Sequence, residues 1–210
     1  MNWMDMSVRE FQAALASSSQ TPGGGGTAAA VSLGQAAALA VMVCDLTLGK
    51  EKWEGGWPTA EHVQALAIPM LNRAGVLASE DSDAFDAVMD SFGLPKSTDD
   101  EKDARRTAIR SAMMTAASVP FETATLAMNL LQGLPELARL GNANAVTDVG
   151  VAGLLASAAA KGAVFNVEIN LQSLPDDYAI EMRTALPQMK ESIRAASREV
   201  MDAVRDRMDE

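Results

Sequence analysis

The most regular pattern of apolar positions lies in the last 30 residues of the chain. Leu186, Met189, Ile193, Ala196 and Val200 recur at three- and four-residue intervals, which is the spacing of one face of a helix. Two earlier stretches, residues 27–48 and 146–170, are apolar on nearly every side. A helix with this pattern must be covered all round, so both are predicted to be central helices.

Local capping signals predict where other helices begin. Ser7 with Glu10, and Thr98 with Glu101, each form a capping box, in which a hydroxyl and a carboxylate satisfy free N–H groups of the first turn. The remaining helices are expected as follows: 7–16, 59–92 with an interruption or kink at Pro69, 98–132 with a bend at Pro120, and a last helix opening at Pro175, Asp176 and Asp177.

Breaks between these segments are short, and alternation typical of a strand occurs only briefly, in residues 165–171. Pro22 and four glycines stop the first helix, since four successive glycines are not expected to hold a helix. The predicted fold is all-α: an antiparallel helical bundle with long, partly kinked helices in a single domain spanning residues 1–210. Two helices with no polar face exceed what so small a domain can cover, which predicts completion by dimerisation, as a homodimer.

The composition supports a helical fold and argues against nucleic acid as a binding partner. Aromatic residues make up 4% of the 210 residues and there are 13 methionines, which favours packed helices over sheet. The net charge is −11 and no cluster of lysine and arginine stands out, so nucleic acid is not expected as a partner.

Single copies of cysteine and histidine exclude several kinds of chemistry. Cys44 has no partner for an internal disulfide, and His62 stands alone in a polar helix start, so neither a multi-histidine metal site nor a metal cofactor is expected. No secretory signal is visible, which favours a cytoplasmic protein. Residues 27–48 are long enough to cross a membrane, but they are mainly alanine and glycine with Ser32, Gln35 and Asp45, which favours a buried helix.

Three segments carry polar groups next to apolar helices. The first is the glycine run, where Gly24 and Gly25 precede a helix and expose backbone N–H groups to an anion or a carbonyl. No lysine followed by serine or threonine comes after the glycines, so this is not a nucleotide loop. The alternative interpretation is a plain helix stop.

The second segment is rich in carboxylates. Asp81 and Phe85 lie four residues apart on one face, which places the Asp81 carboxyl beside apolar surface and predicts a raised pKa, as an acid catalyst near neutrality requires. The alternative is a solvated charged face.

The third segment contains Asn142, Asn144 and Asp148 before an apolar helix. Side-chain amides there are suited to paired hydrogen bonds with a heterocycle. The alternative is a turn that caps the helix.

Taken in order, these segments resemble the formiminotransferase-cyclodeaminase C-terminal family, which includes tetrahydrofolate cyclodeaminase domains and stand-alone methenyltetrahydrofolate cyclohydrolases. The resemblance runs from about residue 7 to 171 and rests on the following motifs: TPGGGGTAAAVS, DLTLGKEKW, DSDAFDAVMDSFGLPK, SVPFETA, GNANAVTDVGVAG and FNVEINL.

The resemblance implies an antiparallel helical dimer and assigns roles to particular residues. It places the proton donor at Asp81 and matches a basic stretch of the family to Lys50 and Lys52. We expect Lys50, Lys52 or Lys96 to contact the anionic glutamate tail of folate. The resemblance also matches Asn142, Asn144 and Asp148 to a turn motif of the family, in which Thr147 replaces serine. Asp148 is the second candidate catalytic carboxylate, beside Asp81. Asp45 and Trp53 depart from the residues usual in the family.

The resemblance also implies the reaction. A stand-alone chain favours methenyltetrahydrofolate cyclohydrolase, which opens the cationic methenyl bridge to a formyl group without metal, nucleotide or other cofactor. Two alternatives stay open: a formiminotetrahydrofolate cyclodeaminase that releases ammonia, and a helical dimer without catalytic activity that binds folate or a protein partner.

Overall fold

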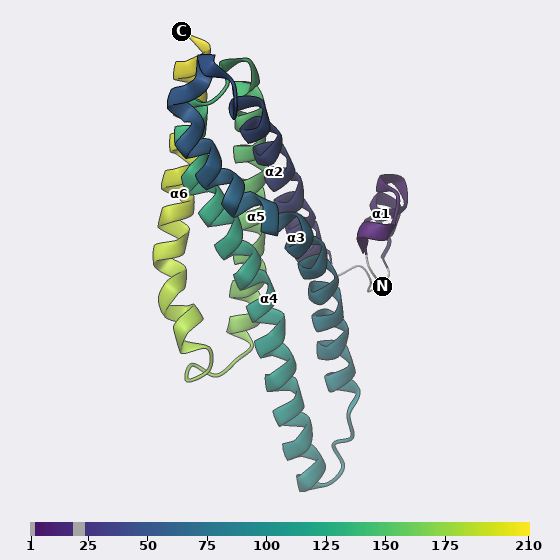
Figure 1. The fold of residues 1–210 in the computed structure, drawn as a ribbon. Coiled ribbons are helices and arrows are strands. Elements are labelled where there is room, and N and C mark those ends of the chain that lie inside the picture. The colour runs from purple at the N-terminus through teal and green to yellow at the C-terminus, as the bar shows by residue number, and fades with distance from the viewer. Residues whose placement is uncertain (1–2, 19–23) are drawn as a thin grey trace.

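The computed structural model describes residues 3–18 and 24–210, and these form helices joined by short turns, with no strand among them (Figure 1). The elements in order are η1 (Trp3–Asp5), α1 (Val8–Leu15), α2 (Gly25–Thr47), η2 (Glu51–Gly56), α3 (Trp57–Gly93), α4 (Asp99–Leu140), η3 (Ala143–Ala145), α5 (Val146–Gln172) and α6 (Ile180–Met208). The predicted all-α fold is therefore confirmed.

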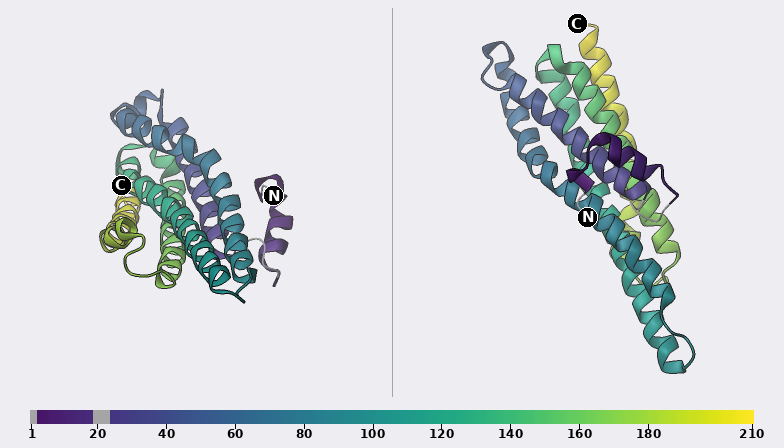
Figure 2. Two further views of the ribbon diagram at one scale, coloured as in Figure 1. Left: turned by 90° about the horizontal axis from the view of Figure 1, so that it is seen from below. Right: turned by 90° about the vertical axis from the view of Figure 1, so that its right-hand side faces the viewer.

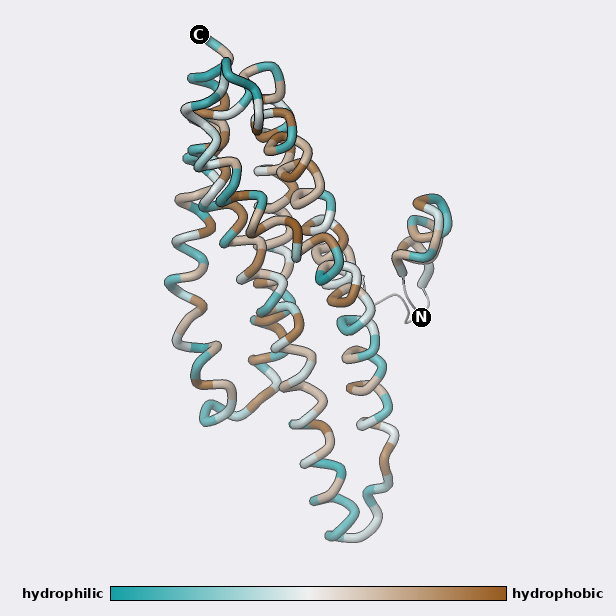
Figure 3. The backbone as a smooth tube through the Cα atoms, viewed as in Figure 1, coloured by the Kyte–Doolittle hydropathy of each residue, from teal (hydrophilic) through white to brown (hydrophobic). Residues whose placement is uncertain are grey.

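Helices α2 to α5 form the body of the bundle. α2 packs against α3 and α5, α4 packs against α3 and α5, and α6 covers α4 and α5. The lower parts of α3 and α4 extend beyond the other helices as a long pair, and α1 lies to one side (Figures 1 and 2). The main core draws its buried apolar residues from all five helices α2 to α6. Brown, apolar segments accordingly occur along each helix in the body of the bundle (Figure 3).

Both predicted capping boxes are present. The Ser7 hydroxyl accepts from the Glu10 N–H at the start of α1, and the Thr98 hydroxyl accepts from the Glu101 N–H at the start of α4. In each box the glutamate carboxylate accepts the N–H of the capping residue, at 2.8 and 3.0 Å respectively. These starts were predictable because every group involved lies within one turn.

The prolines within α3 and α4 do not end these helices. α3 runs unbroken through Pro69, so an interruption at that residue is wrong. α4 runs through Pro120 and Pro135 to Leu140, eight residues beyond the predicted end. A proline removes one helical hydrogen bond, but packing along the rest of a long helix offsets that loss. Pro120 and Pro135 are both buried.

The helix ends near glycine also differ from expectation. α2 begins at Gly25, so Gly25 and Gly26 are helical, whereas Gly24 before them adopts a positive φ, of 71°. The last helix begins at Ile180 rather than at Pro175, after a turn in which Ala179 has a φ of 56°.

The two apolar helices form the centre of the bundle. Both α2 and the 143–172 segment are long and apolar enough to cross a membrane by length and composition, yet about half of each apolar window is buried inside the fold. Cys44 is buried in α2 and His62 is exposed on α3, both as expected. The structure is that of a helical domain in which both apolar helices are core helices.

Candidate functional site

Asp81 lies on α3 beside the first turn of α2. Its carboxylate accepts a hydrogen bond from the Thr27 hydroxyl at 3.1 Å, and the Thr27 backbone N–H also donates to it. Gly26 makes this approach possible, because a Cβ at that position would lie 2.1 Å from Asp81 Oδ1. A carboxylate at a helix N-terminus also meets the positive end of the helix dipole.

Burial changes the acidity of this carboxyl. It raises the pKa of Asp81 from 3.8 to about 6, against the opposing effect of the Thr27 hydrogen bonds. A group with a pKa near 6 can both take up and release a proton close to neutral pH. The predicted desolvation of Asp81 is therefore confirmed.

The predicted glycines adjoin this carboxyl. Gly24 caps α2 and Gly25 begins it; both are exposed, and a Cβ added to Gly24 would meet no neighbouring atom. Gly25 faces Asn166 of α5, whose amide nitrogen would lie 3.6 Å from an added Cβ. The start of α2 thus presents backbone N–H groups beside Asp81, which suits an oxygen or an anion of a ligand.

Sequence reasoning missed the residues that hold Asp81 in place. Thr27 was expected only as a helix start, Gly26 only as one of four glycines that stop a helix, and Ser82 was not considered. Their roles depend on contacts between α2 and α3, and the nearest available signal was the threonine directly after the glycine run.

The other predicted residues, apart from Lys96, lie at the far end of α2. Lys50 and Lys52 follow its C-terminus, and Asn142 is joined to that terminus by two hydrogen bonds, to Thr47 Oγ1 and the Leu46 carbonyl, at 3.0 and 2.9 Å. A helix of 23 residues spans about 35 Å at 1.5 Å per residue. One chain therefore brings Asp81 together with the glycines, but not with this second group.

The second group itself is held in place by the turn it forms. The Asn142 side-chain oxygen accepts from the Asn144 N–H at 3.0 Å, so Asn142 caps η3, which agrees with the alternative interpretation of this segment as a capping turn. Asn144 is exposed and Asp148 is partly buried in the first turn of α5. Lys50 is exposed, and the Lys52 ammonium lies 4.7 Å from the centre of the Trp53 ring.

Lys96 lies in a third place, the loop between α3 and α4. It lines a pocket of about 730 Å³ together with four other cationic side chains and no acidic one. The cationic residues of this basic pocket are Lys96, Lys102, Arg105, Arg106 and Arg110. In a chain of net charge −11, this is a local positive region suited to an anionic group.

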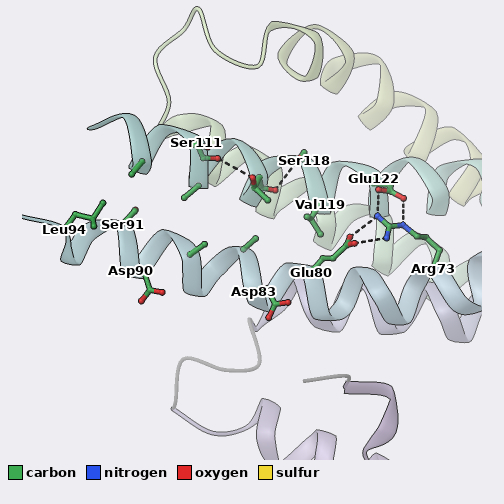
Figure 4. A pocket seen from close by; sticks show the side chains of 15 residues that line it. Arg73, Glu80, Asp83, Asp90, Ser91, Leu94, Ser111, Ser118, Val119 and Glu122 are labelled. Atoms are coloured by element: carbon green, nitrogen blue, oxygen red, sulfur yellow. Dashed lines mark hydrogen bonds and ion pairs between the residues drawn. The ribbon is translucent and has the colours of Figure 1, made fainter. Parts of the chain in front are cut away.

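A larger groove, of about 960 Å³, runs between α3 and α4 (Figure 4). Arg73 closes one end of it by pairing with Glu80 at 2.9 Å and with Glu122 at 2.6 Å. Asp83 lines this groove, but Asp81 does not. The groove is therefore separate from the carboxyl with the perturbed pKa, and its arginine already has two carboxylate partners.

With this geometry established, the chain can be compared with known proteins. The sequence matches the family described as Formiminotransferase-cyclodeaminase over residues 7–203. The chain belongs to this family.

Relatives in the formiminotransferase-cyclodeaminase family carry two names. A methenyltetrahydrofolate cyclohydrolase from Methylorubrum extorquens is 39% identical over 84% of this chain and 84% of its own length. A formimidoyltransferase-cyclodeaminase from Mus musculus is 36% identical over 83% of this chain, which spans only 32% of that protein. The crystal structure of formiminotetrahydrofolate cyclodeaminase from Thermotoga maritima superposes with a TM-score of 0.84, at 28% identity, over 97% of this chain and 98% of the other.

The two departures from the family pattern have local partners. Asp45 accepts a hydrogen bond from the Gln64 amide at 2.6 Å. This bond joins the C-terminal end of α2 to α3. Trp53 is contacted by Lys52 on one side and by the Arg207 guanidinium, 5.6 Å from its ring centre. Both residues thus shape the surface around Lys50 rather than the surroundings of Asp81.

Proposed function

We propose that this protein is a methenyltetrahydrofolate cyclohydrolase, with Asp81 as its proton-transfer group. The observation that carries the proposal is the Asp81 carboxyl, whose pKa lies near 6, at the glycine-bordered start of α2. The cyclohydrolase relative supports the same reaction, because it matches this chain over most of both lengths. The relative from Mus musculus, whose name combines two activities, is about three times as long as the region that matches this chain.

The chemistry requires one group that moves a proton twice. Water adds to the cationic methenyl carbon, and its proton passes to the ionised Asp81 carboxylate. As the bond from this carbon to N5 breaks, the carboxyl returns the proton to N5, and the hydroxyl proton leaves to solvent as the formyl group on N10 forms. A carboxylate also stabilises the substrate cation before water adds.

A formiminotetrahydrofolate cyclodeaminase is the second candidate, favoured by the Thermotoga maritima structure. There N10 attacks a formimino carbon on N5, and the same carboxyl would supply a proton to departing ammonia. Both reactions place a tetrahedral carbon between N5 and N10, so Asp81 suits either.

One assay separates these candidates. The purified protein is mixed with 5,10-methenyltetrahydrofolate, and loss of the near-ultraviolet absorbance of the bridge is followed; ammonia release from formiminotetrahydrofolate is measured in parallel. We expect rapid loss of the bridge and little ammonia, also in the presence of a metal chelator, because no cluster of metal-binding side chains occurs in residues 3–18 and 24–210. Ammonia release as the faster reaction would reverse the assignment, and no turnover of either compound would leave a folate-binding or partner-binding protein.

A homodimer is part of this proposal, with the exposed faces of α2 and α5 as the contact. α2 and α5 pack against each other, and large apolar side chains along both helices are exposed to solvent. They are Met42, Leu46, Val151, Leu154, Phe165 and Ile169, between 37% and 69% exposed. A two-fold pairing that runs these helices antiparallel brings the Asp81 end of one protomer towards the Lys50 and Asn142 end of its partner. This would unite the two groups of predicted residues that a single chain keeps apart.

The apolar contact has a direct test. Leu154→Glu, at a position 58% exposed on α5, is expected to convert the dimer into a folded monomer with little activity, because it buries a charge in the contact. The control is Ile180→Glu, at a position 61% exposed on α6, which should leave the dimer intact. Light scattering at micromolar concentration reports the state, and a wild-type monomer with full activity would contradict the dimer.

The basic pocket is proposed to hold the glutamate tail of folate. Lys96→Glu combined with Arg106→Glu is expected to raise KM by about 3–10-fold and to leave kcat nearly unchanged, since exposed charges contribute up to about 1 kcal/mol each. Arg198→Glu, exposed on α6, is the matched control. A KM equal to that of the control would place the tail elsewhere, for example at Lys50 and Lys52.

The proposed substrate and the composition of the chain both suit a cytoplasmic location. Reduced folates are small soluble anions, and the chain has one cysteine and an acidic composition. We therefore propose that the protein works in the cytoplasm.

A further inference from the structure

Trp3 is buried although it lies at the beginning of the described chain. It is 7% exposed and packs with Ala30 of α2 and with Leu77 and Ala78 of α3, in a small apolar cluster apart from the main core. Of the N-terminal segment, η1 contacts α3, whereas α1 has no buried residue and stands to the side of the bundle (Figures 1 and 2). Trp3 is therefore the anchor of this segment.

The Trp3 indole begins a line of hydrogen bonds that ends at Asp81. Its Nε1–H donates to Ser82 Oγ at 2.9 Å, and Ser82 Oγ lies 3.2 Å from Thr27 Oγ1. The Thr27 hydroxyl in turn donates to Asp81 Oδ2 at 3.1 Å. Ser82 and Thr27 are 2% and 0% exposed, so this relay joins η1, α3 and α2 out of contact with water.

Chemistry gives the relay a direction. An indole nitrogen can only donate, so Ser82 is the acceptor in its bond with Trp3. A hydroxyl that accepts a hydrogen bond becomes a better donor, which favours donation from Ser82 to Thr27. The Thr27 proton then points to Asp81 Oδ2 at 3.1 Å, in preference to the Ala78 carbonyl at 3.4 Å.

We propose that Trp3 is a positioning residue for catalysis, which holds the Thr27 hydroxyl on Asp81 through Ser82 and so keeps the carboxyl at the start of α2. The proposal rests on the proposed role of Asp81 and adds to it a residue 78 positions away in the sequence, on a separate element. Trp3 does not touch the substrate; it acts through two buried hydroxyls.

Asp81 titrates in surroundings with few other charges. α2 carries no ionisable side chain before Cys44 and Asp45 at its other end. Around it, α3 carries Glu80 and Asp83, which line the groove with Arg73 and with Glu122 of α4. Further ionisable groups on the same and neighbouring elements include Asp86 of α3, Asp5 of η1, Arg9 and Glu10 of α1, Arg110 of α4, and Lys161 and Glu168 of α5. Burial and Thr27 alone account for the pKa of Asp81, so weakening the Thr27 bond should raise that pKa further.

The test compares Trp3→Phe, Ser82→Ala and the double variant with Phe11→Leu. Trp3→Phe keeps the aromatic packing but removes the donor, and Phe11 packs in the same cluster without taking part in the relay. We expect Trp3→Phe and Ser82→Ala each to move the pH profile of kcat upward by about 0.3–1 unit and to lower kcat at pH 6 several-fold, with KM unchanged. The double variant should resemble either single variant, because both interrupt one relay.

A readout that does not need turnover is the carboxyl titration of Asp81, followed by carbon NMR in the free protein. An upward shift in Trp3→Phe, absent in Phe11→Leu, supports the relay even if neither folate compound proves to be a substrate, in which case only the proposed function fails. Unchanged titration and pH profile in a folded Trp3→Phe overturn the relay. Fully additive effects of Trp3→Phe and Ser82→Ala, or an equal shift in Phe11→Leu, overturn it as well.

Discussion

Asp81→Asn is expected to lower turnover by about 10²–10⁴-fold, the usual contribution of a general acid–base group. Asparagine keeps the size of the side chain and an oxygen that can accept from Thr27, but it cannot exchange a proton. Folate binding should weaken much less than turnover, because the change removes proton transfer rather than shape. Steady-state kinetics and a direct binding measurement determine the two quantities separately.

Neighbouring and distant carboxylates provide the controls. Asp83→Asn, two residues away and exposed in the groove between α3 and α4, should retain nearly normal turnover. Asp148→Asn tests the other predicted carboxylate, at the far end of α2 and α5. If Asp148→Asn abolishes turnover while Asp81→Asn retains it, the assignment of the proton-transfer group is wrong.

Asp81→Asn is also expected to make the fold more stable at neutral pH. The pKa of Asp81 is about 6 in the folded chain against 3.8 for a free carboxyl, so the folded state holds its proton over this range and the unfolded state does not. The contribution of Asp81 to stability is therefore greatest below pH 4 and is lost as pH rises through 6. Asp81→Asn should exceed wild type by about 1–3 kcal/mol above pH 7 and match it near pH 4, measured by urea unfolding. A constant difference at both pH values would contradict burial of the charged carboxylate as the cause.

Gly26→Ala is expected to abolish most activity by displacing the carboxyl. The added Cβ would lie 2.1 Å from Asp81 Oδ1 and 2.5 Å from its Cγ, so the Asp81 side chain must rotate away from Thr27. Turnover should fall by about 10²-fold, since misplacing a catalytic group by an ångström has effects of that size. The fold should persist, because alanine is favoured over glycine within a helix by about 0.5–1 kcal/mol.

Gly162→Ala is the matched control for this change. Its Cβ would lie 3.6 Å from the Ala29 Cβ, an ordinary contact, so turnover should stay close to wild type and stability should be equal or slightly higher. The double variant Gly26→Ala with Asp81→Asn should be no slower than Asp81→Asn itself, because both act on one carboxyl. Near-normal turnover in Gly26→Ala would show that the carboxyl does not work from its place beside Thr27.

Individual residues show how much of the candidate site could be predicted from the sequence. The sequence singled out Asp81 as a carboxyl with a raised pKa because it shares a helix face with Phe85. In the structure Phe85 is 39% exposed, and Asp81 is covered instead by the first turn of α2, at Gly26 and Thr27. Thr27 and Ser82, which direct that carboxyl, did not follow, since their bonds join α2 to α3 across more than 50 residues. Likewise, Asn142 was recognised as a polar turn residue, but its bonds to Thr47 and Leu46 depend on how α4 and α2 end side by side.

The sequence by itself determined the all-helical fold and the starts of α1 and α4. Each of these depends on groups within one or two turns, where periodicity and capping operate without regard to the rest of the chain. Only the tertiary structure decided that α3 and α4 continue through their prolines, since packing along 37 and 42 residues outweighs a lost hydrogen bond. It alone also separated the predicted residues into groups at opposite ends of α2, because distance in space depends on which helices pack together and in which direction they run.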